Sequence, residues 1–221
     1  MENKYTGFLK GRRELYENRE KCPPDGDIPV LQFVNTLHRR ETDRKDYLKN
    51  YDCFLDWAYD THLIEDAVYN TLAFESYSYW PEAEMIFARV IGFRECFHGL
   101  VISLVKGVAP YPEMVYNFNI YFEEVKQHLS LNMNGYGMQE IWVDTHEQIA
   151  FPLWKIINDA KDFLIAADGQ SIKKCQCGNL FIDRSNARKR RWCSFATCGN
   201  AHWSKAHYRR RKGLVEIEEG I

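Results

Sequence analysis

The sequence lacks any long hydrophobic run. Its longest strongly apolar stretch, residues 100–105, is far too short to span a bilayer, so we expect no membrane partner. Residues 1–20 are polar and lack the apolar centre of a secretory signal, and we therefore expect a cytoplasmic protein whose thiols stay reduced. Glycine-rich phosphate loops, nucleophile elbows and evident acid–base pairs are also missing, which argues against an enzyme.

The sequence does contain enough apolar residues for a core, since 45% of its 221 residues are hydrophobic and 14% are aromatic. Helical periodicity predicts helices at about residues 46–59, 65–74, 80–105 and 152–167, and a further helix that starts at Pro112. Residues 28–34 indicate a short buried strand or an extended entry segment, and Asn134-Gly135 predicts a small hairpin within residues 131–149. The expected fold class is mainly α with a small β element.

Charge is divided unevenly along the chain. Residues 171–212 carry five Lys and seven Arg against one acid, a net charge of +11. Residues 1–170 carry 17 bases and 27 acids, a net charge of −10, and the last nine residues carry three Glu. Such asymmetry is typical of a nucleic-acid-binding appendage on an acidic body. The basic segment can also dock on the body of its own chain, and the two roles are compatible.

Four of the seven cysteines lie in this basic segment, as Cys175-x-Cys177 and Cys193-x4-Cys198. Two such pairs around a short connection suit a tetrahedral Zn²⁺ site with Zn–S distances of about 2.3 Å. On an extended strand the first two side chains point the same way, and the second pair can meet across a turn into a helix expected over residues 201–212. His202, four residues after Cys198, is an alternative ligand that could replace Cys175.

A metal also explains how so charged a segment folds. Its few apolar residues cannot offset the entropy of the chain. Trp192 and Trp203 are expected in this small core, and the alternative is that they serve as platforms on which bases stack. Zn²⁺ binding contributes on the order of 10 kcal/mol to folds of this size. Because four protein ligands leave no position for water, we predict a structural ion and a small C-terminal zinc finger that follows an α-rich N-terminal domain.

The cations of the finger need a partner, because a four-thiolate site does not neutralise them. Phosphates attract such a surface, and binding should weaken steeply with salt. We expect a DNA-binding surface formed by Arg188, Lys189, Arg190, Arg191, Asn200, Lys205, Arg209, Arg210, Arg211 and Lys212. The other interpretation is a zinc finger that docks to protein or RNA without sequence-specific DNA binding.

At these residues the sequence resembles the CGNR zinc-finger family. The matching motifs are the first cysteine pair, Phe181-Ile182-Asp183, Arg191-Trp192-Cys193 and Cys198-Gly199-Asn200-Ala201. The preceding region resembles the ABATE domain of bacterial stress-induced transcription regulators, at Phe33-Val34-Asn35-Thr36, Leu55-Asp56-Trp57, Arg94-Glu95 and the helix that contains Leu164. The chain departs from the finger pattern twice, because its first cysteine pair is shorter than usual and Ala201 replaces the Arg that closes the motif.

The resemblance implies a transcription regulator with a ligand-sensing or dimerising body. On this basis we predict an N-terminal extension (1–27), an ABATE-like α-rich domain (28–168), a finger with a basic helix (171–213) and an acidic tail (214–221). The expected partners are DNA, a small molecule bound in the N-terminal domain and a second copy of the chain as a homodimer. Asn35 and Arg94 are the candidate residues of the ligand pocket, with a structural role for Arg94 as the alternative.

Overall fold

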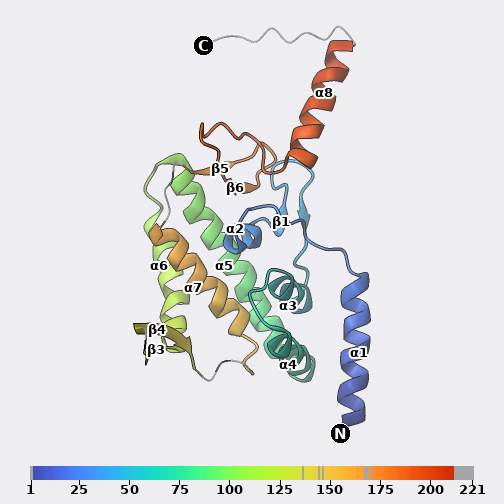
Figure 1. The fold of residues 1–221 in the computed structure, drawn as a ribbon, viewed down its shortest axis with the longest axis vertical. Helices are drawn as coiled ribbons and strands as arrows, with labels where there is room; N and C mark the ends of the chain where they lie inside the picture. Colours follow the sequence, from blue (N-terminus) through green and yellow to red (C-terminus); the bar gives the residue numbers. More distant parts are fainter. Residues whose placement is uncertain are drawn as a thin grey trace.

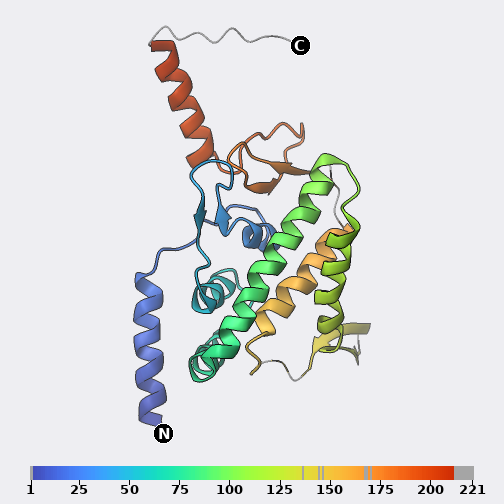
Figure 2. The same cartoon turned by 180° about the vertical axis from the view of Figure 1, so that it is seen from behind.

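The computed structural model describes residues 2–135, 137–143, 145, 147–166, 169 and 171–211. The chain is mainly α-helical, with an α-rich body and a small finger at the carboxyl end (Figure 1). Within the described residues, no helix is long and apolar enough to cross a membrane. The first and last helices, α1 and α8, lie at opposite ends of the molecule (Figure 2).

The long helix α5 runs through the body. It contacts α6 and α7 on one side and α3 and α4 on the other. Their bounds are α3 (Tyr51–Asp60), α4 (Asp66–Ser78), α5 (Trp80–Lys106), α6 (Pro112–Lys126) and α7 (Phe151–Ala166). Pro81 and Pro112 lie in the first turns of their helices, where the missing amide hydrogen of proline costs nothing. The helices predicted near residues 65–74, 80–105 and 152–167, and the one from Pro112, are thus confirmed, although residue 167 lies outside the described residues.

Aromatic rings fill the centre of the body. Phe33 contacts Trp57 at 5.3 Å and Phe93 at 6.0 Å between ring centroids, and Phe93 stacks on Phe97 at 6.0 Å. Phe33, Phe93 and Phe97 are fully buried. These rings join α3 and α5 to the short helix α2 (Pro29–Val34).

The strand predicted at residues 28–34 is wrong, because this segment forms α2. Pro29 occupies its first turn, and Val30, Leu31, Phe33 and Val34 are all buried. A short apolar run has too little periodicity to distinguish a buried strand from a helix. The helix lets Phe33 enter the aromatic core while Asn35, the residue that caps its end, faces the finger.

The helix predicted at 46–59 begins later than expected. Asp46 belongs to the two-stranded sheet formed by β1 (Leu37–His38) and β2 (Lys45–Asp46). The side chain of Asn50 accepts a hydrogen bond from the Cys53 amide at 2.9 Å and caps α3. An N-cap with this geometry sets the start of the helix more firmly than the apolar pattern does.

The polar extension forms a helix that the sequence did not predict, α1 (Glu2–Asn18). Arg12 pairs with Asp52 at 2.6 Å and with Asp56 at 3.1 Å. Arg19, just after the helix, pairs with Asp56 at 2.9 Å and with Asp60 at 2.6 Å. The sequence of this helix has little apolar periodicity. Ion pairs to α3 and contacts with α4 hold it in place instead.

The predicted hairpin is confirmed as β3 (Leu129–Asn134) and β4 (Gly137–Trp142), which pair antiparallel with Leu129 opposite Trp142. The finger begins with a second hairpin, β5 (Ile172–Lys174) and β6 (Leu180–Ile182), in which Lys174 pairs with Leu180. A π-helical turn, η1 (Phe195–Gly199), then leads into α8 (Asn200–Arg211). Ile172 and Leu180 belong to the same apolar cluster as the body, so the finger is docked rather than tethered.

Candidate metal centre

The four predicted cysteines come together at one point. The sulfur atoms of Cys175, Cys177, Cys193 and Cys198 all lie within 4.8 Å of one another, and all four side chains are buried. Cys193 Sγ lies 3.7 Å from Cys177 Sγ and 3.6 Å from Cys198 Sγ. Four sulfurs at about 2.3 Å from one tetrahedral ion are separated by roughly 3.8 Å. The donor set therefore fits Zn²⁺.

The first cysteine pair lies on a turn, not on the extended strand that we expected. The Gly178 amide donates to the Cys175 carbonyl at 2.8 Å, and the Cys175 amide donates to the Asn179 carbonyl at 2.8 Å. Gly178 has φ +98°, and a Cβ there would lie 3.1 Å from atoms of Arg40 and Glu41. Glycine thus allows both the tight turn and its close approach to the body.

The second pair is held by η1. Ser194 caps this turn by accepting a hydrogen bond from the Thr197 amide at 3.4 Å, and the Gly199 amide bonds to the Ser194 carbonyl at 3.0 Å. The widened turn brings Cys198 beside Cys193 just before α8 begins. The orientation of α8 is therefore tied directly to the second ligand pair.

Four crowded thiols need a cation if they are all to ionise. The hydrogen bond between Cys177 and Cys175 raises the pKa of Cys177 to about 12. Such thiols release their protons when a divalent ion binds, so metal binding here is coupled to proton release and weakens in acid. No position is left for water once four protein ligands bind, which makes this a structural arrangement rather than a catalytic one.

His202 does not join the cluster, which is composed of cysteines alone within the described residues. Its ring is exposed and packs against Trp192, with 4.7 Å between the ring centroids. The ligand set with His202 in place of Cys175 is therefore not the one that the geometry favours. The side chain of Cys175 is 1% exposed and lies within the sulfur cluster.

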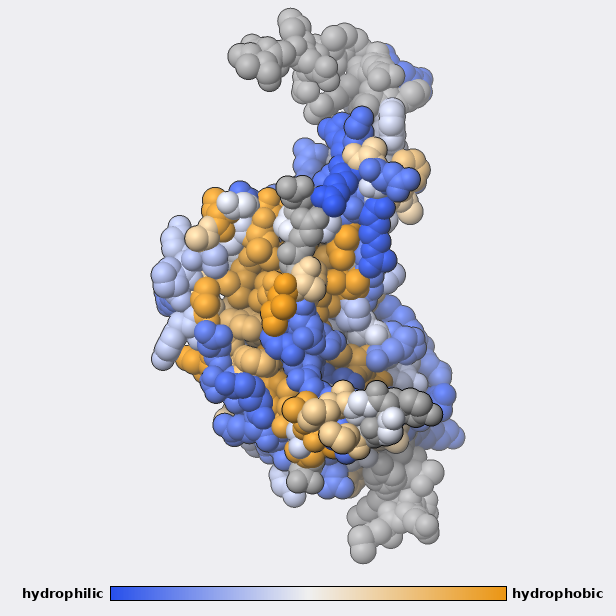
Figure 3. All heavy atoms as spheres, turned by 60° about the vertical axis from the view of Figure 1, so that its left-hand side comes forward, coloured by the Kyte–Doolittle hydropathy of each residue, from blue (hydrophilic) through white to orange (hydrophobic). Residues whose placement is uncertain are grey.

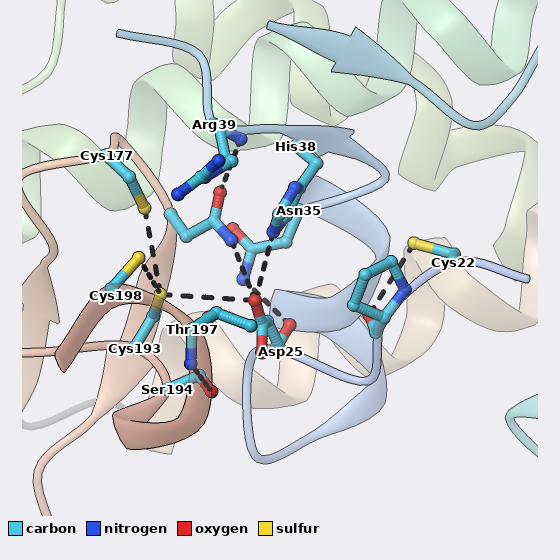
Figure 4. Close-up of polar contacts among 12 residues, drawn as sticks. Cys22, Asp25, Asn35, His38, Arg39, Cys177, Cys193, Ser194, Thr197 and Cys198 are labelled. Carbon is cyan, nitrogen blue, oxygen red and sulfur yellow. Dashed lines mark hydrogen bonds and ion pairs between the residues drawn. The ribbon is translucent and has the colours of Figure 1, made fainter. Parts of the chain in front are cut away.

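A loop of the body, residues 25–27, reaches the metal centre from outside the finger (Figure 4). Asp25 Oδ2 lies 4.0 Å from Cys193 Sγ, 3.2 Å from Asn179 Nδ2 and 3.1 Å from His38 Nε2. Asp27 accepts a hydrogen bond from the Ile182 amide at 3.0 Å. We call residues Asp25, Gly26 and Asp27 the acidic clamp.

The acidic clamp depends on its glycine. Gly26 has φ +140°, and a Cβ there would come within 2.6 Å of the Gln32 backbone nitrogen in α2. A side chain would therefore force the clamp away from α2 and from the finger. The sequence contained this signal as Asp-Gly-Asp in a proline-rich loop, but spacing alone did not connect it with cysteines about 150 residues away.

Asn35 fastens the finger to α2, whereas its place in a ligand pocket stays a prediction. Its Nδ2 donates to the Leu180 carbonyl and to the Asp25 carbonyl, both at 2.8 Å, and its Oδ1 accepts from the Leu180 amide at 2.9 Å. The side chain is buried, and these bonds use both of its amide hydrogens.

Arg94 takes the structural role that we gave as the alternative. It is 2% exposed and forms a two-pronged ion pair with Asp46 at 2.8 and 2.7 Å, with further bonds to the Thr36 hydroxyl at 3.1 Å and to Glu95 at 3.0 Å. Burial alone would lower the pKa of Arg94, but the bonds to Asp46 raise it overall, so the charge is retained. These bonds use four of the five N–H donors of Arg94 and fit the structural role, so a place for Arg94 in a ligand pocket stays a prediction.

Arg190 also turns inward, which removes it from the predicted DNA surface. Its guanidinium contacts both Asp27 oxygens at 3.1 Å, lies 4.7 Å from the Phe181 ring centroid and donates to the carbonyls of Ile182, Trp192 and Cys193. Its amide donates to Asp183 at 2.9 Å. The hydrogen-bond donors of Arg190 are therefore used in contacts that stabilise the fold of the finger.

Asp183, the single acid of the finger, organises the loop between the two ligand pairs. It accepts hydrogen bonds from Lys173 at 2.7 Å and from the Ser185 hydroxyl at 2.6 Å. Burial raises the pKa of Asp183, but these bonds outweigh it and hold the pKa well below its usual range. The carboxylate therefore stays charged and fixes the loop that carries Arg188 and Lys189.

The other predicted DNA-binding residues fall into two groups. Arg188, Lys189, Arg191, Asn200 and Arg211 are exposed on the finger. Lys205, Arg209 and Arg210 lie on α8 with side chains outside the described residues, and Lys212 is outside them altogether. Trp192 packs against the cysteine cluster as expected, whereas Trp203 is 59% exposed and is not part of the core.

Two family models match the chain. The ABATE family, described as "Putative stress-induced transcription regulator", matches residues 27–167. The CGNR zinc finger matches residues 172–211 and so includes the whole cysteine cluster. A search of the curated proteins found no match.

Proposed function

The chain belongs to the ABATE family of stress-induced transcription regulators and carries a CGNR zinc finger, and from this premise we propose that it regulates transcription by binding DNA through the finger. Zn²⁺ would be held by the four clustered cysteines. It would supply structural stabilisation by closing the finger around its two ligand pairs. The cationic surface, made rigid in this way, would contact phosphates.

The observation that carries this proposal is the separation of inward and outward cations on the finger. Lys173 and Arg190 pair with Asp183 and Asp27 and stabilise the fold. Arg184, Arg188, Lys189, Arg191 and Arg211 are exposed. Hydrophilic residues, blue in Figure 3, cover the region where α8 rises from the body, whereas apolar residues, orange, are prominent on the face of the body below it. A surface of this kind binds phosphates with strong dependence on salt.

The body holds the finger in a fixed orientation. Three parts of the body bind the first hairpin of the finger. They are Asn35, the acidic clamp, and Glu41, whose amide donates a hydrogen bond to the Cys177 carbonyl at 3.2 Å. We therefore propose that the body presents the finger and that changes in the body alter DNA affinity. Figure 1 supports this role, since α8 extends away from the body.

A cavity of about 240 Å³ is the place where we propose that an effector acts. It is lined by residues that include Arg19, Cys22, Pro24, Tyr47, Cys53 and Trp57. Its wall at residues 22–24 leads directly into the acidic clamp. An effector bound there would change DNA affinity by the same factor by which DNA changes effector affinity, because thermodynamic coupling is reciprocal. A compound that binds in this cavity and leaves DNA affinity unchanged would contradict the proposal.

The DNA-binding proposal is tested by titrating the full chain, loaded with Zn²⁺, into a labelled duplex at several salt concentrations. We expect the logarithm of the binding constant to fall linearly with the logarithm of salt, and Arg188→Gln to reduce that slope by about 0.9. The matched control is Arg13→Gln, which removes the same charge from α1, where the side chain is 82% exposed. Equal slopes for both variants, or no binding to duplex at low salt, would contradict DNA binding through the finger.

A further inference from the structure

The finger exposes large aromatic side chains among its cations. Phe195 is 70% exposed and Trp203 is 59% exposed. Both lie next to the second ligand pair, Phe195 in η1 and Trp203 one turn into α8. The finger does not need Trp203 for its own core, because Phe181 and Trp192 already pack on the cysteine cluster. The exposed indole therefore requires an explanation outside the fold.

The indole of Trp203 belongs to a row of rings. Trp192 packs on the cysteines and contacts His202 at 4.7 Å between centroids, and His202 contacts Trp203 at 6.3 Å. The guanidinium of Arg191 lies 5.7 Å from the Trp192 ring. We call Arg191, Trp192, His202 and Trp203 the aromatic row. One end of it is anchored at the metal centre, and the other end is open to solvent.

We propose that the aromatic row stacks on unpaired bases, so that the finger prefers DNA with unstacked nucleotides over a closed duplex. This inference rests on the proposed function, since it names the form of DNA that the finger recognises. In a closed duplex the faces of the bases are covered by their neighbours, and only base edges and phosphates are accessible. An exposed indole gains little from such edges, whereas on an unstacked base it covers a whole ring face.

The charges beside the aromatic row fit the same partner. Arg188, Lys189 and Arg191 are exposed on the segment that leads into Trp192 and Cys193. A strand that crosses these cations would bring its bases over the row while its phosphates meet the guanidinium groups. Aromatic rings inside a positively charged surface are the usual platform for single strands, and each stacked base contributes to affinity without reading sequence.

The test compares three labelled DNAs of the same length: a perfect duplex, the same duplex with a short unpaired bubble, and a single strand. The full chain with bound Zn²⁺ is used throughout. We expect tighter binding to the bubble and the single strand than to the perfect duplex. Trp203→Ala should weaken binding to both unpaired forms by about tenfold while it changes duplex affinity less than about twofold.

Two controls keep the result specific. Trp80→Ala removes an indole that is 66% exposed on α5, far from the finger along the chain, and should leave all three affinities unchanged. Trp203→Phe keeps a ring at the position and should restore most of the lost affinity. Because Trp203→Ala removes no charge, the dependence on salt should keep its wild-type slope, and unchanged zinc content would show that the finger is intact.

Each outcome decides between the two proposals. Equal wild-type affinity for all three DNAs, with Trp203→Ala without effect, would overturn the stacking inference and leave duplex binding intact. A Trp203→Ala variant that loses affinity for all three DNAs equally would also overturn it. If Trp203→Ala changed only the oligomeric state, the row would be an interface between copies of the chain. Failure of the wild type to bind any DNA would remove the proposed function and this inference together.

Discussion

The side-chain amide of Asn35 pairs with both backbone polar groups of Leu180. Nδ2 donates to the Leu180 carbonyl at 2.8 Å, and the Leu180 amide donates to Oδ1 at 2.9 Å. A single side chain thus replaces a neighbouring strand for β6 and joins α2 to the finger across 145 residues of sequence. The finger and the body therefore share one hydrogen-bonded interface as well as one apolar core.

Asn35→Ala should destabilise the protein by about 2–4 kcal/mol, because it leaves the buried polar groups of Leu180 without partners. Unfolding in urea, followed by circular dichroism, measures this change. Asn119→Ala, on the exposed face of α6, is the matched control and should change the free energy of unfolding by less than about 0.5 kcal/mol. A similar small change at Asn35 would show that the interface does not depend on this pair.

Cys175→Ser should abolish stable binding of one Zn²⁺ per chain, because it removes one of four clustered sulfur ligands. His202→Gln should keep the full metal content, as should Cys22→Ser, which changes a cysteine outside the cluster. Elemental analysis of the purified variants measures the content directly. The opposite pattern, with metal lost in His202→Gln and kept in Cys175→Ser, would favour the ligand set that includes histidine. Chelation of the wild type should lower its Tm.

Arg190→Gln should destabilise the finger by roughly 2 kcal/mol, since it removes charge-assisted bonds to Asp27 and to backbone carbonyls. The slope of DNA affinity against salt concentration should stay as in the wild type, because the guanidinium of Arg190 is directed into the fold. The neighbouring variant Arg191→Gln serves as the control for stability and should change it little, since Arg191 is exposed. A reduced salt slope in Arg190→Gln would show instead that this side chain contacts phosphate.

The protein should lose stability below neutral pH through His98. Burial, together with the nearby charge of Arg40, lowers the pKa of His98 to about 4, and its Nε2 has no hydrogen-bond partner among the residues that the structure describes. The unfolded chain binds a proton near pH 6.5 whereas the folded chain does not, so stability falls as the pH drops from about 6.5 towards 4. At pH 5.5 this effect amounts to about 1.3 kcal/mol relative to pH 7.5.

His98→Gln cannot titrate and should remove that part of the pH dependence. The comparison uses the difference in unfolding free energy between wild type and variant at pH 7.5 and at pH 5.5, so that proton-linked loss of metal cancels. Relative to the wild type, the unfolding free energy of the variant should be higher at pH 5.5 than at pH 7.5 by roughly 1.3 kcal/mol. A difference that stays constant with pH would exclude His98 as the titrating group.

Features with a local cause could be predicted from the sequence. Helix α5 follows from Pro81 and from apolar residues at helical spacing, and Asn134-Gly135 marks the place where β3 ends before β4. The four cysteines were recognisable because metal geometry restricts the spacing of ligands. The reason that we gave for Cys175 and Cys177 was incomplete, because a turn that depends on Gly178 brings them together.

Features that depend on distant partners could not be predicted. Helix α2 buries Val30, Leu31, Phe33 and Val34 against the rest of the body, and α1 is held by pairs such as Arg12 with Asp56. Asn35 and Arg94 were predicted as pocket residues from the family resemblance. Their true partners, Leu180 and Asp46, follow only from the assembled fold. Trp203 was expected inside because aromatic residues usually are, yet a finger closed by metal has a core too small to include it.

Because α8 begins directly after the second ligand pair, a small rotation at Cys198 is amplified along the helix. With 12 residues, α8 is about 18 Å long, so each degree of rotation at Cys198 moves its far end by about 0.3 Å. Exchange of the ion for one with longer bonds to sulfur would tilt this arm and shift its tip relative to any phosphate it meets. The identity of the bound metal would then change the position of the far end of α8, with no alteration in the body.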